Sequence, residues 1–318
     1  MNKNENRLPN RRQFVVQSGL LAGGAFAMAS APCCAALTSP LLAKADSEPW
    51  FEISLAQWSL HRMLHAGKLD NLGFPAFTKE KFQIEAVEYV NRFFKDKAED
   101  QKYLAELNSR CSDAGVESVL IMVDGEGALG DPDEAKRKKA IENHHRWVTA
   151  AKTLGCHSIR VNAKSGGDYQ EQVKLAADGL RQLSEFAAQH QINVIVENHG
   201  GLSSNGQWLA QVIRNVNLGN CGTLPDFGNF RISKGVSYDR YLGMAAMLPY
   251  AKAVSAKSHE FDKDGNETKS DFIKMMTLVK DSGYRGYVGV EFEGRGISEV
   301  EGVIKTRDLL LRCRKELS

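Results

Sequence analysis

The sequence predicts an α/β protein in which residues 46–318 form one domain, a (β/α)8 TIM barrel. After Pro49, short apolar and β-branched runs recur eight times, with starts about 30 to 40 residues apart. Helical stretches lie between these runs, and several end in a glycine just before the next run, as helix C-caps commonly do. Strands alternating with helices over this length fit a parallel barrel. A doubly wound open sheet is the alternative, although it would normally use fewer strands and place a phosphate-binding loop after the first.

The predicted elements follow in chain order. The strands are Phe51–Trp58, Ile84–Val90, Val116–Val123, Ser158–Asn162, Asn193–Glu197, Gly222–Asp226, Ala253–His259 and Tyr287–Glu291. The clearest helical stretches are Ala135–Leu154, Glu171–His190 and Ser270–Ser282. Gly115, Gly155 and Gly283 stand where a helix gives way to a strand. This order predicts a barrel whose strands are joined by outer helices.

Residues 1–45 resemble a twin-arginine signal peptide. Arg11 and Arg12 precede an apolar start, and a small-residue run follows at 19–29. Ala43-Lys44-Ala45 then matches a small-x-small cleavage site. The run is shorter than the roughly 20 residues of a membrane span and is interrupted by glycines. We therefore expect export to the periplasm or the extracellular space, with a retained anchor or a lipidated cysteine as alternatives.

Charge and cysteine content narrow the function classes. The whole chain has a net charge of +2, but five of its 41 basic residues and one of its 39 acidic residues lie in the first 45 positions. The remaining 36 basic and 38 acidic residues give −2, which argues against binding of nucleic acid. Cysteines after the leader are widely spaced and include no C-x-x-C pair, so we expect buried free thiols. They are Cys111, Cys156, Cys221 and Cys313.

A glycine-rich segment at 125–130 matches the dinucleotide-binding pattern G-x-G-x-x-G. It follows the third predicted strand rather than the first. Glu126 and Asp131 would also place negative charge where a pyrophosphate would lie. A glycine-rich connection at the barrel mouth is a sufficient explanation.

Four successive predicted strands in the second half end on a carboxylate or an imidazole: Glu197, Asp226, His259 and Glu291. In a (β/α)8 barrel the carboxyl ends of the strands meet at one mouth, where active sites lie. Three oxygen ligands and one nitrogen ligand suit Mn²⁺, Mg²⁺, Co²⁺ or Zn²⁺. The alternative is a polar network that caps the barrel without a metal.

Three motifs, together with these strand ends, resemble the xylose isomerase-like TIM barrels. The motifs are Leu224–Phe230, Ala253–His259 and Gly286–Gly294, and the resemblance covers roughly residues 50–315. It implies that Glu197, Asp226, His259 and Glu291 bind one divalent metal ion, with Mn²⁺ as the first choice. It also implies that Glu197 and Glu291 are catalytic and exchange protons with the substrate.

The resemblance implies a sugar isomerase or epimerase that removes a proton next to a carbonyl and passes through a metal-stabilised enediolate. A lyase or dehydratase acting on a keto-sugar with the same site is the alternative, followed by a non-catalytic carbohydrate-binding protein. Asn229 stands where endonuclease IV relatives and well-understood ketose epimerases have histidine. DNA repair is therefore disfavoured, and the expected partner is a small carbohydrate. Homo-oligomer formation stays open.

A wider set of residues is expected to bind substrate around the metal. The set comprises His199, Lys257, Asn229, Glu293, Arg160, Asn162 and Trp58. His199 lies two residues after Glu197, and Lys257 two before His259, so each shares a strand face with a predicted ligand. Core hydrogen bonding is the alternative for His199, a buried ion pair with a ligand carboxylate for Lys257, and a core position for Trp58.

Overall fold

Eight parallel strands form the centre of the protein in the computed structural model, which describes residues 49–318. The hydrogen-bonded order is β6-β5-β4-β3-β2-β1-β10-β9. Bridges between Thr223 and Ala251 and between Asp226 and Ser255 bring the two end strands, β6 and β9, together. The strands are β1 (Glu52–Ala56), β2 (Ala86–Val90), β3 (Glu117–Met122), β4 (Ser158–Val161), β5 (Asn193–Glu197), β6 (Cys221–Leu224), β9 (Val254–Ser258) and β10 (Tyr287–Phe292). The predicted (β/α)8 barrel is confirmed.

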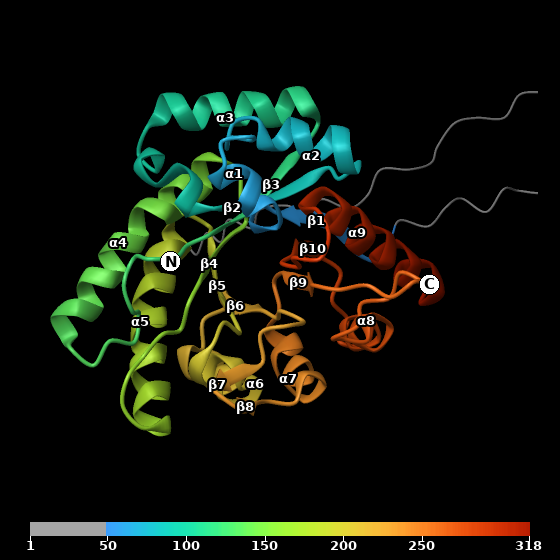
Figure 1. Cartoon of the computed structure of the whole chain (residues 1–318). Coiled ribbons are helices and arrows are strands. Elements are labelled where there is room, and N and C mark those ends of the chain that lie inside the picture. The colour runs from blue at the N-terminus through green and yellow to red at the C-terminus, as the bar shows by residue number, and fades with distance from the viewer. Residues whose placement is uncertain (1–48) are drawn as a thin grey trace, which may run out of the picture. The chain divides into compact units, whose positions relative to one another are not determined.

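Helices surround these strands (Figure 1). They are α1 (His61–His65), α2 (Phe74–Phe82), α3 (Gln101–Ala114), α4 (Glu134–Thr153), α5 (Tyr169–Gln189), α6 (Gly206–Val216), α7 (Arg240–Met247), α8 (Phe272–Asp281) and α9 (Glu299–Glu316). Side-chain caps begin the two longest: Asp133 accepts from Ala135 N, and Asp168 accepts from Glu171 N. The three helical stretches predicted from sequence match α4, α5 and α8 to within two residues at each end. Gly115 adopts φ 62° after α3, as a left-handed C-cap.

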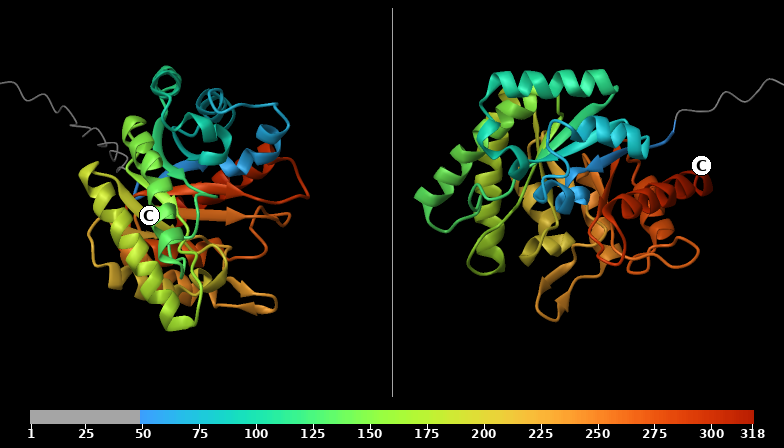
Figure 2. Two further views of the ribbon diagram at one scale, coloured as in Figure 1. Left: turned by 90° about the vertical axis from the view of Figure 1, so that its left-hand side faces the viewer. Right: turned by 45° about the horizontal axis from the view of Figure 1, so that its top comes forward.

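Short elements occupy the connections between strands and helices. A hairpin of β7 (Arg231–Ser233) and β8 (Val236–Ser237) follows β6 and projects from the body (Figure 2). Short 3-10 helices lie at Gln57–Leu60, Asn91–Lys97, Gly201–Ser204 and Leu248–Tyr250, and the second of them is kinked at Phe94. The first of these contains Trp58, which the sequence had placed in the first strand.

Apolar residues fill the barrel beneath its carboxyl-terminal mouth. Ile195 and Leu224 are fully buried, and each lies two residues before an acidic residue, Glu197 or Asp226. Because side chains two apart share a strand face, the same alternation that packs the interior turns these carboxylates inward at the mouth. The barrel interior therefore changes from apolar to charged along the strands.

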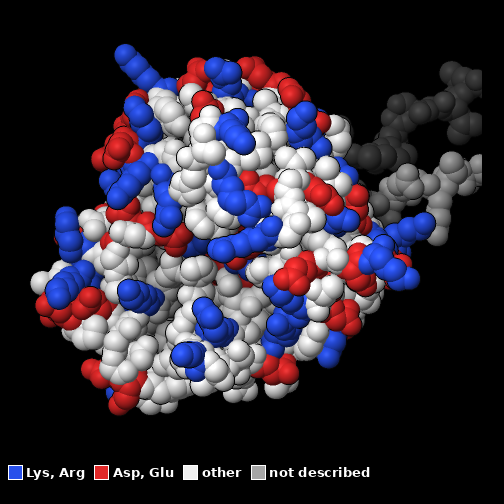
Figure 3. Space-filling model, in the orientation of Figure 1, with Lys and Arg blue, Asp and Glu red and all other residues white. Residues whose placement is uncertain are grey.

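The surface and the remaining predictions complete the description. Basic and acidic side chains are mixed over the face seen in Figure 3. The four cysteines after the leader are buried and free, as expected. Within residues 49–318, none of the helices combines the length and the apolarity that crossing a membrane requires. The predicted signal peptide at 1–45 lies outside the described residues.

Candidate metal and catalytic site

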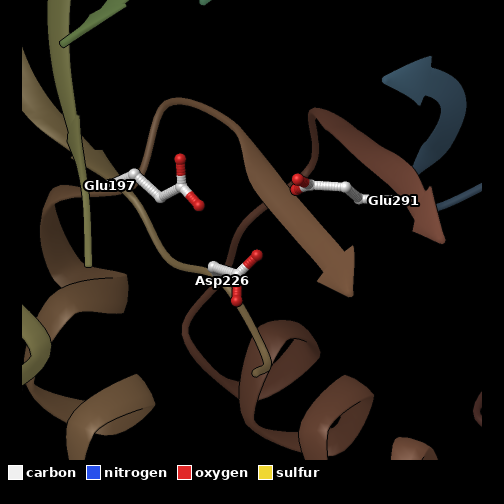
Figure 4. Close-up of side chains that lie close together, drawn as sticks. All are labelled: Glu197, Asp226 and Glu291. Atoms are coloured by element: carbon white, nitrogen blue, oxygen red, sulfur yellow. The ribbon is translucent and has the colours of Figure 1, made fainter. Parts of the chain in front are cut away.

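Three carboxylates converge at the mouth of the barrel. Glu197 ends β5, Asp226 follows β6, and Glu291 lies in β10, and their side chains point toward one another (Figure 4). One carboxylate oxygen from each lies within 4.8 Å of the others. All three residues are buried, with relative exposures of 1%, 0% and 3%. Three of the four predicted metal ligands therefore meet.

Local hydrogen bonds hold Asp226 in place. Its Oδ1 accepts from the backbone N–H groups of Gly228 (2.7 Å) and Asn229 (2.8 Å), and its own N–H donates to Asn198 Oδ1 (2.7 Å). The Ser255 hydroxyl lies 2.9 Å from Asp226 Oδ2 and 2.7 Å from Glu291 Oε2. Burial raises the pKa of Asp226 to about 8, with Lys257 acting against it. The backbone and one hydroxyl thus fix the geometry of this carboxylate.

The ammonium of Lys257 lies against two members of the acidic group formed by Glu197, Asp226 and Glu291. Its Nζ is 3.2 Å from Glu291 Oε1, 3.5 Å from Asp226 Oδ2 and 3.6 Å from Glu293 Oε2. Lys257 is the direct neighbour of Glu291 in the β9–β10 pairing, so both side chains enter the barrel at one level. Burial alone would lower the pKa of Lys257, but the surrounding carboxylates raise it well above its usual value. The lysine therefore supplies a permanent positive charge.

Gly228 leaves space for this lysine. A Cβ added at residue 228 would lie 3.0 Å from Lys257 Cδ and 3.1 Å from its Cγ. Such contacts are tighter than ordinary van der Waals packing, so a side chain here would press on the lysine stem. The glycine of the Asp226–Asn229 turn is thus matched to a lysine at position 257.

A second buried cation, Arg160, pairs with Glu197. Arg160 Nε lies 2.9 Å from Glu197 Oε2, and Arg160 Nη1 donates to Asp124 Oδ1 at 2.9 Å. Asn162 donates to the same Asp124 oxygen at 2.7 Å, and Asn229 Nδ2 donates to Glu197 Oε1 at 2.8 Å. Burial acts to raise the pKa of Asp124, but Arg160 and Asn162 outweigh it and lower that pKa to about 2.

Sequence reasoning missed Asp124 and Glu88. Glu88 is buried in the middle of β2, accepts from Ser54 Oγ at 2.5 Å, and has its pKa raised by burial to about 8. The nearby charges of Glu291 and Glu197 raise that pKa further. A carboxylate in the middle of the apolar run Ala86–Val90 was the available signal, because such a residue seldom enters a barrel interior unpaired. Asp124 could have been found as the first polar residue after β3, two positions beyond its end.

The remaining predicted residues form a partly exposed layer around the carboxylates. His259 Nε2 lies 3.9 Å from Glu293 Oε2, burial lowers the pKa of His259, and the structure does not bring this residue into the three-carboxylate group. Trp58 donates from Nε1 to Glu293 Oε1 at 2.6 Å and stacks on His61. His199 is exposed, and its backbone N–H donates to Ser203 Oγ at 3.0 Å.

The three carboxylates have the donor chemistry that a divalent cation requires. Glu197 Oε2 is buried and accepts no hydrogen bond. Arg160 Nε lies 2.9 Å away and forms an ion pair with it, without the geometry of a hydrogen bond. Hard divalent cations bind carboxylate oxygens of this kind. The acidic group could therefore hold a metal ion through Glu197, Asp226 and Glu291. Any such ion would share Asp226 and Glu291 with Lys257.

A family model described as Xylose isomerase-like TIM barrel matches residues 73–313. No curated protein matches the chain. Among solved structures, a xylose isomerase-like TIM barrel protein from Mycobacterium smegmatis in complex with magnesium superposes with a TM-score of 0.63 at 15% identity, over 83% of this chain and 97% of that one. A 3-keto-D-glucoside 4-epimerase from E. coli gives 0.56 at 16% identity, over 84% and 100%. A probable 3-DHS dehydratase from Bacillus anthracis gives 0.58 at 14% identity, over 82% and 98%.

At these identities the solved structures show the shared fold. Epimerases, isomerases and a dehydratase all occur among them. One neighbour carries magnesium and another a bound zinc atom. Enzymes of sugar metabolism and proteins with a bound divalent metal thus both occur among the structures that share this fold.

Proposed function

We propose that this chain, which belongs to the xylose isomerase-like TIM barrel family, is a divalent-metal-dependent isomerase or epimerase of a small carbohydrate. The observation that carries the proposal is the buried group of Glu197, Asp226 and Glu291 at the carboxyl-terminal mouth. Burying these inward carboxylates and the two cations beside them costs folding free energy. Groups of buried charges of this kind are found mainly at functional sites.

The proposed chemistry is proton transfer at a carbon next to a carbonyl. Glu197 and Glu291 approach a common point from different strands, β5 and β10. A carboxylate on one side would take the proton and its counterpart would return it, which inverts the carbon. When bound, a divalent ion, with Mn²⁺ as our first choice and Mg²⁺, Co²⁺ or Zn²⁺ as alternatives, would polarise the substrate carbonyl.

The other residues of the site would position these groups. Arg160 and Asn229 each contact one carboxylate oxygen of Glu197, which fixes the orientation of its side chain. Lys257 holds Glu291 and offsets its negative charge. Trp58, whose ring stacks on His61, and Glu293, which accepts its hydrogen bond, would contact the sugar beside the carboxylates. The sugar would also contact His199, Asn162 and His259. His259 is in addition the proposed fourth metal ligand.

A second candidate function is a lyase or dehydratase on a keto-sugar. A probable dehydratase among the structural neighbours supports this second candidate. The first step, removal of the proton beside the carbonyl, is the same in both reactions. They differ afterwards, because elimination expels a hydroxyl group instead of returning the proton.

Deuterium wash-in tests the proposal. Purified protein with Mn²⁺ is incubated in D2O with candidate keto-sugars, and the recovered sugars are analysed by mass spectrometry and NMR. Label in a rearranged sugar supports an isomerase or epimerase, whereas loss of water supports a lyase. Glu197→Gln and Glu291→Gln, which keep side-chain size, should each abolish the exchange. Full activity of either variant would contradict the two-glutamate mechanism, and binding without exchange of any sugar would favour a carbohydrate-binding protein.

We also propose that the enzyme acts outside the cytoplasm. The support is the twin-arginine pattern at Arg11 and Arg12 and the small-x-small sequence that ends at Ala45. Fractionation of cells expressing the full chain, with an Arg11→Lys/Arg12→Lys variant as control, tests this. Export that does not change in the double variant would contradict it.

A further inference from the structure

A cavity of about 700 Å3 lies among the connections at the carboxyl-terminal mouth of the barrel. Its walls come from the connections that follow β3, β4 and β5, with contributions from α5 and α6. The residues that carry the argument are Ala128, Asn162, Lys164, His199, Gly200 and Leu202. Because those connections leave the carboxyl ends of the strands, the cavity opens on the same mouth as the carboxylates.

Two residues that line the cavity, His199 and Asn162, connect it to Glu197. His199 lies two residues beyond Glu197 along the same chain segment. Asn162 donates to Asp124, which pairs with Arg160, and Arg160 in turn contacts Glu197. A molecule that reacts at Glu197 would therefore extend into this cavity on the side of β4 and β5.

The lining has the chemistry of a carbohydrate subsite. Lys164 is its one permanently charged residue, and no carboxylate occurs among the described residues that line it. Asn162 Oδ1 is buried and has no hydrogen-bond partner, so a sugar hydroxyl would satisfy it. Leu202 and Ala128, which are partly exposed, add apolar surface for the C–H faces of a sugar ring. The acidic group, in contrast, is built from charged residues.

Glycine in the wall leaves part of this volume open. Gly200 has φ 83°, and a Cβ added there would meet no atom within 4 Å. The cavity volume falls within the range of roughly 300 to 1,000 Å3 that small-molecule sites occupy. The cavity is thus large enough for a sugar ring. None of the described residues that line it belongs to the acidic group, against which the reacting ring would lie.

Resting on the proposed function, we propose that this cavity binds a second sugar residue, so that the substrate class is a keto-glycoside rather than a free ketose. The reacting keto-sugar ring would lie against Glu197 and Glu291, and the glycosidic partner would lie between Asn162 and Leu202. A phosphate group would use little of the volume and would find one lysine, so a neutral second ring fits better.

The test compares a keto-disaccharide, the matching free keto-monosaccharide and its phosphate in the deuterium-exchange assay. Ala128→Trp fills the cavity, and Ala66→Trp places the same side chain in a separate cavity of about 610 Å3 near α1 and α9. We expect the wild type to prefer the disaccharide by at least roughly tenfold in kcat/KM. Ala128→Trp should remove this preference and leave exchange on the monosaccharide within about twofold, whereas Ala66→Trp should preserve the preference.

Several results would overturn the cavity assignment. They are equal wild-type rates on disaccharide and monosaccharide, a preference for the phosphate, or an Ala128→Trp variant that slows both sugars alike. If the wild type exchanges label on none of the sugars, the proposed function has failed and the cavity is tested by calorimetric titration with an unoxidised disaccharide. Binding that Ala128→Trp weakens and Ala66→Trp does not would uphold the cavity, whereas no binding would refute it.

Discussion

Replacement of Lys257 by methionine should strengthen divalent metal binding. The ammonium of Lys257 lies 3.2 Å from Glu291 Oε1 and 3.5 Å from Asp226 Oδ2, so an ion that takes these oxygens must displace it or tolerate its charge. Breaking a buried ion pair costs about 3–5 kcal/mol, which corresponds to at least a hundredfold in Kd. In Lys257→Met the carboxylates have lost their counter-ion and bind protons more readily. These protons compete with Mn²⁺ and reduce the gain in metal affinity. We therefore expect Mn²⁺ to bind the variant at least roughly tenfold more tightly than the wild type.

Calorimetric titration of metal-free protein with Mn²⁺ measures this change directly, without any substrate. Lys257→Arg retains the charge and should bind no more tightly than the wild type. Lys252→Met, just before the start of β9, is the matched control for loss of a lysine. Thermal unfolding gives a second readout, because Mn²⁺ should raise the midpoint of Lys257→Met more than that of the wild type. Equal or weaker Mn²⁺ binding by a folded Lys257→Met would refute the reasoning.

Two further predictions concern stability. Because the pKa of Asp124 in the folded protein is about 2 and lies below its value in the unfolded chain, its carboxylate stabilises the fold above about pH 4, and this contribution is lost as the pH falls through 2. Asp124→Asn should therefore lower the free energy of unfolding by about 2 kcal/mol at pH 7, with a smaller difference in urea titrations near pH 3; a difference independent of pH would contradict the pairing with Arg160. Gly302→Ala should cost about 1–3 kcal/mol in thermal unfolding, because the new Cβ would overlap ring carbons of Phe292. Gly296→Ala, whose Cβ would meet no atom within 4 Å, is its control, and equal effects would contradict the packing argument.

The fold was predictable because its signals are local. Alternating apolar runs and helix caps such as Gly115 depend on neighbouring residues, so they survive without knowledge of the tertiary structure. The convergence of Glu197, Asp226 and Glu291 was also predictable, because a parallel barrel brings all its strand ends to one mouth. Trp58 was misplaced because polar and apolar residues go on alternating through the 3-10 turn Gln57–Leu60, so the pattern does not mark where the strand stops.

The choice between Lys257 and His259 depended on information that the sequence did not contain. The two residues are separated by two positions, so strand alternation turns both toward the same face and cannot rank them. Their height relative to Glu291 depends on the register between β9 and β10, which pairs Lys257 with Glu291 and leaves His259 beyond the end of β9. That register is a property of the closed barrel, set by strand stagger around the whole ring. The same register explains why a lysine is tolerated at position 257, because its ammonium lies near the carboxylates of Asp226, Glu291 and Glu293. Two residues later, the imidazole of His259 has Glu293 nearby, at 3.9 Å. A change that shifts β9 by two residues would therefore exchange the ammonium for the imidazole at the acidic group.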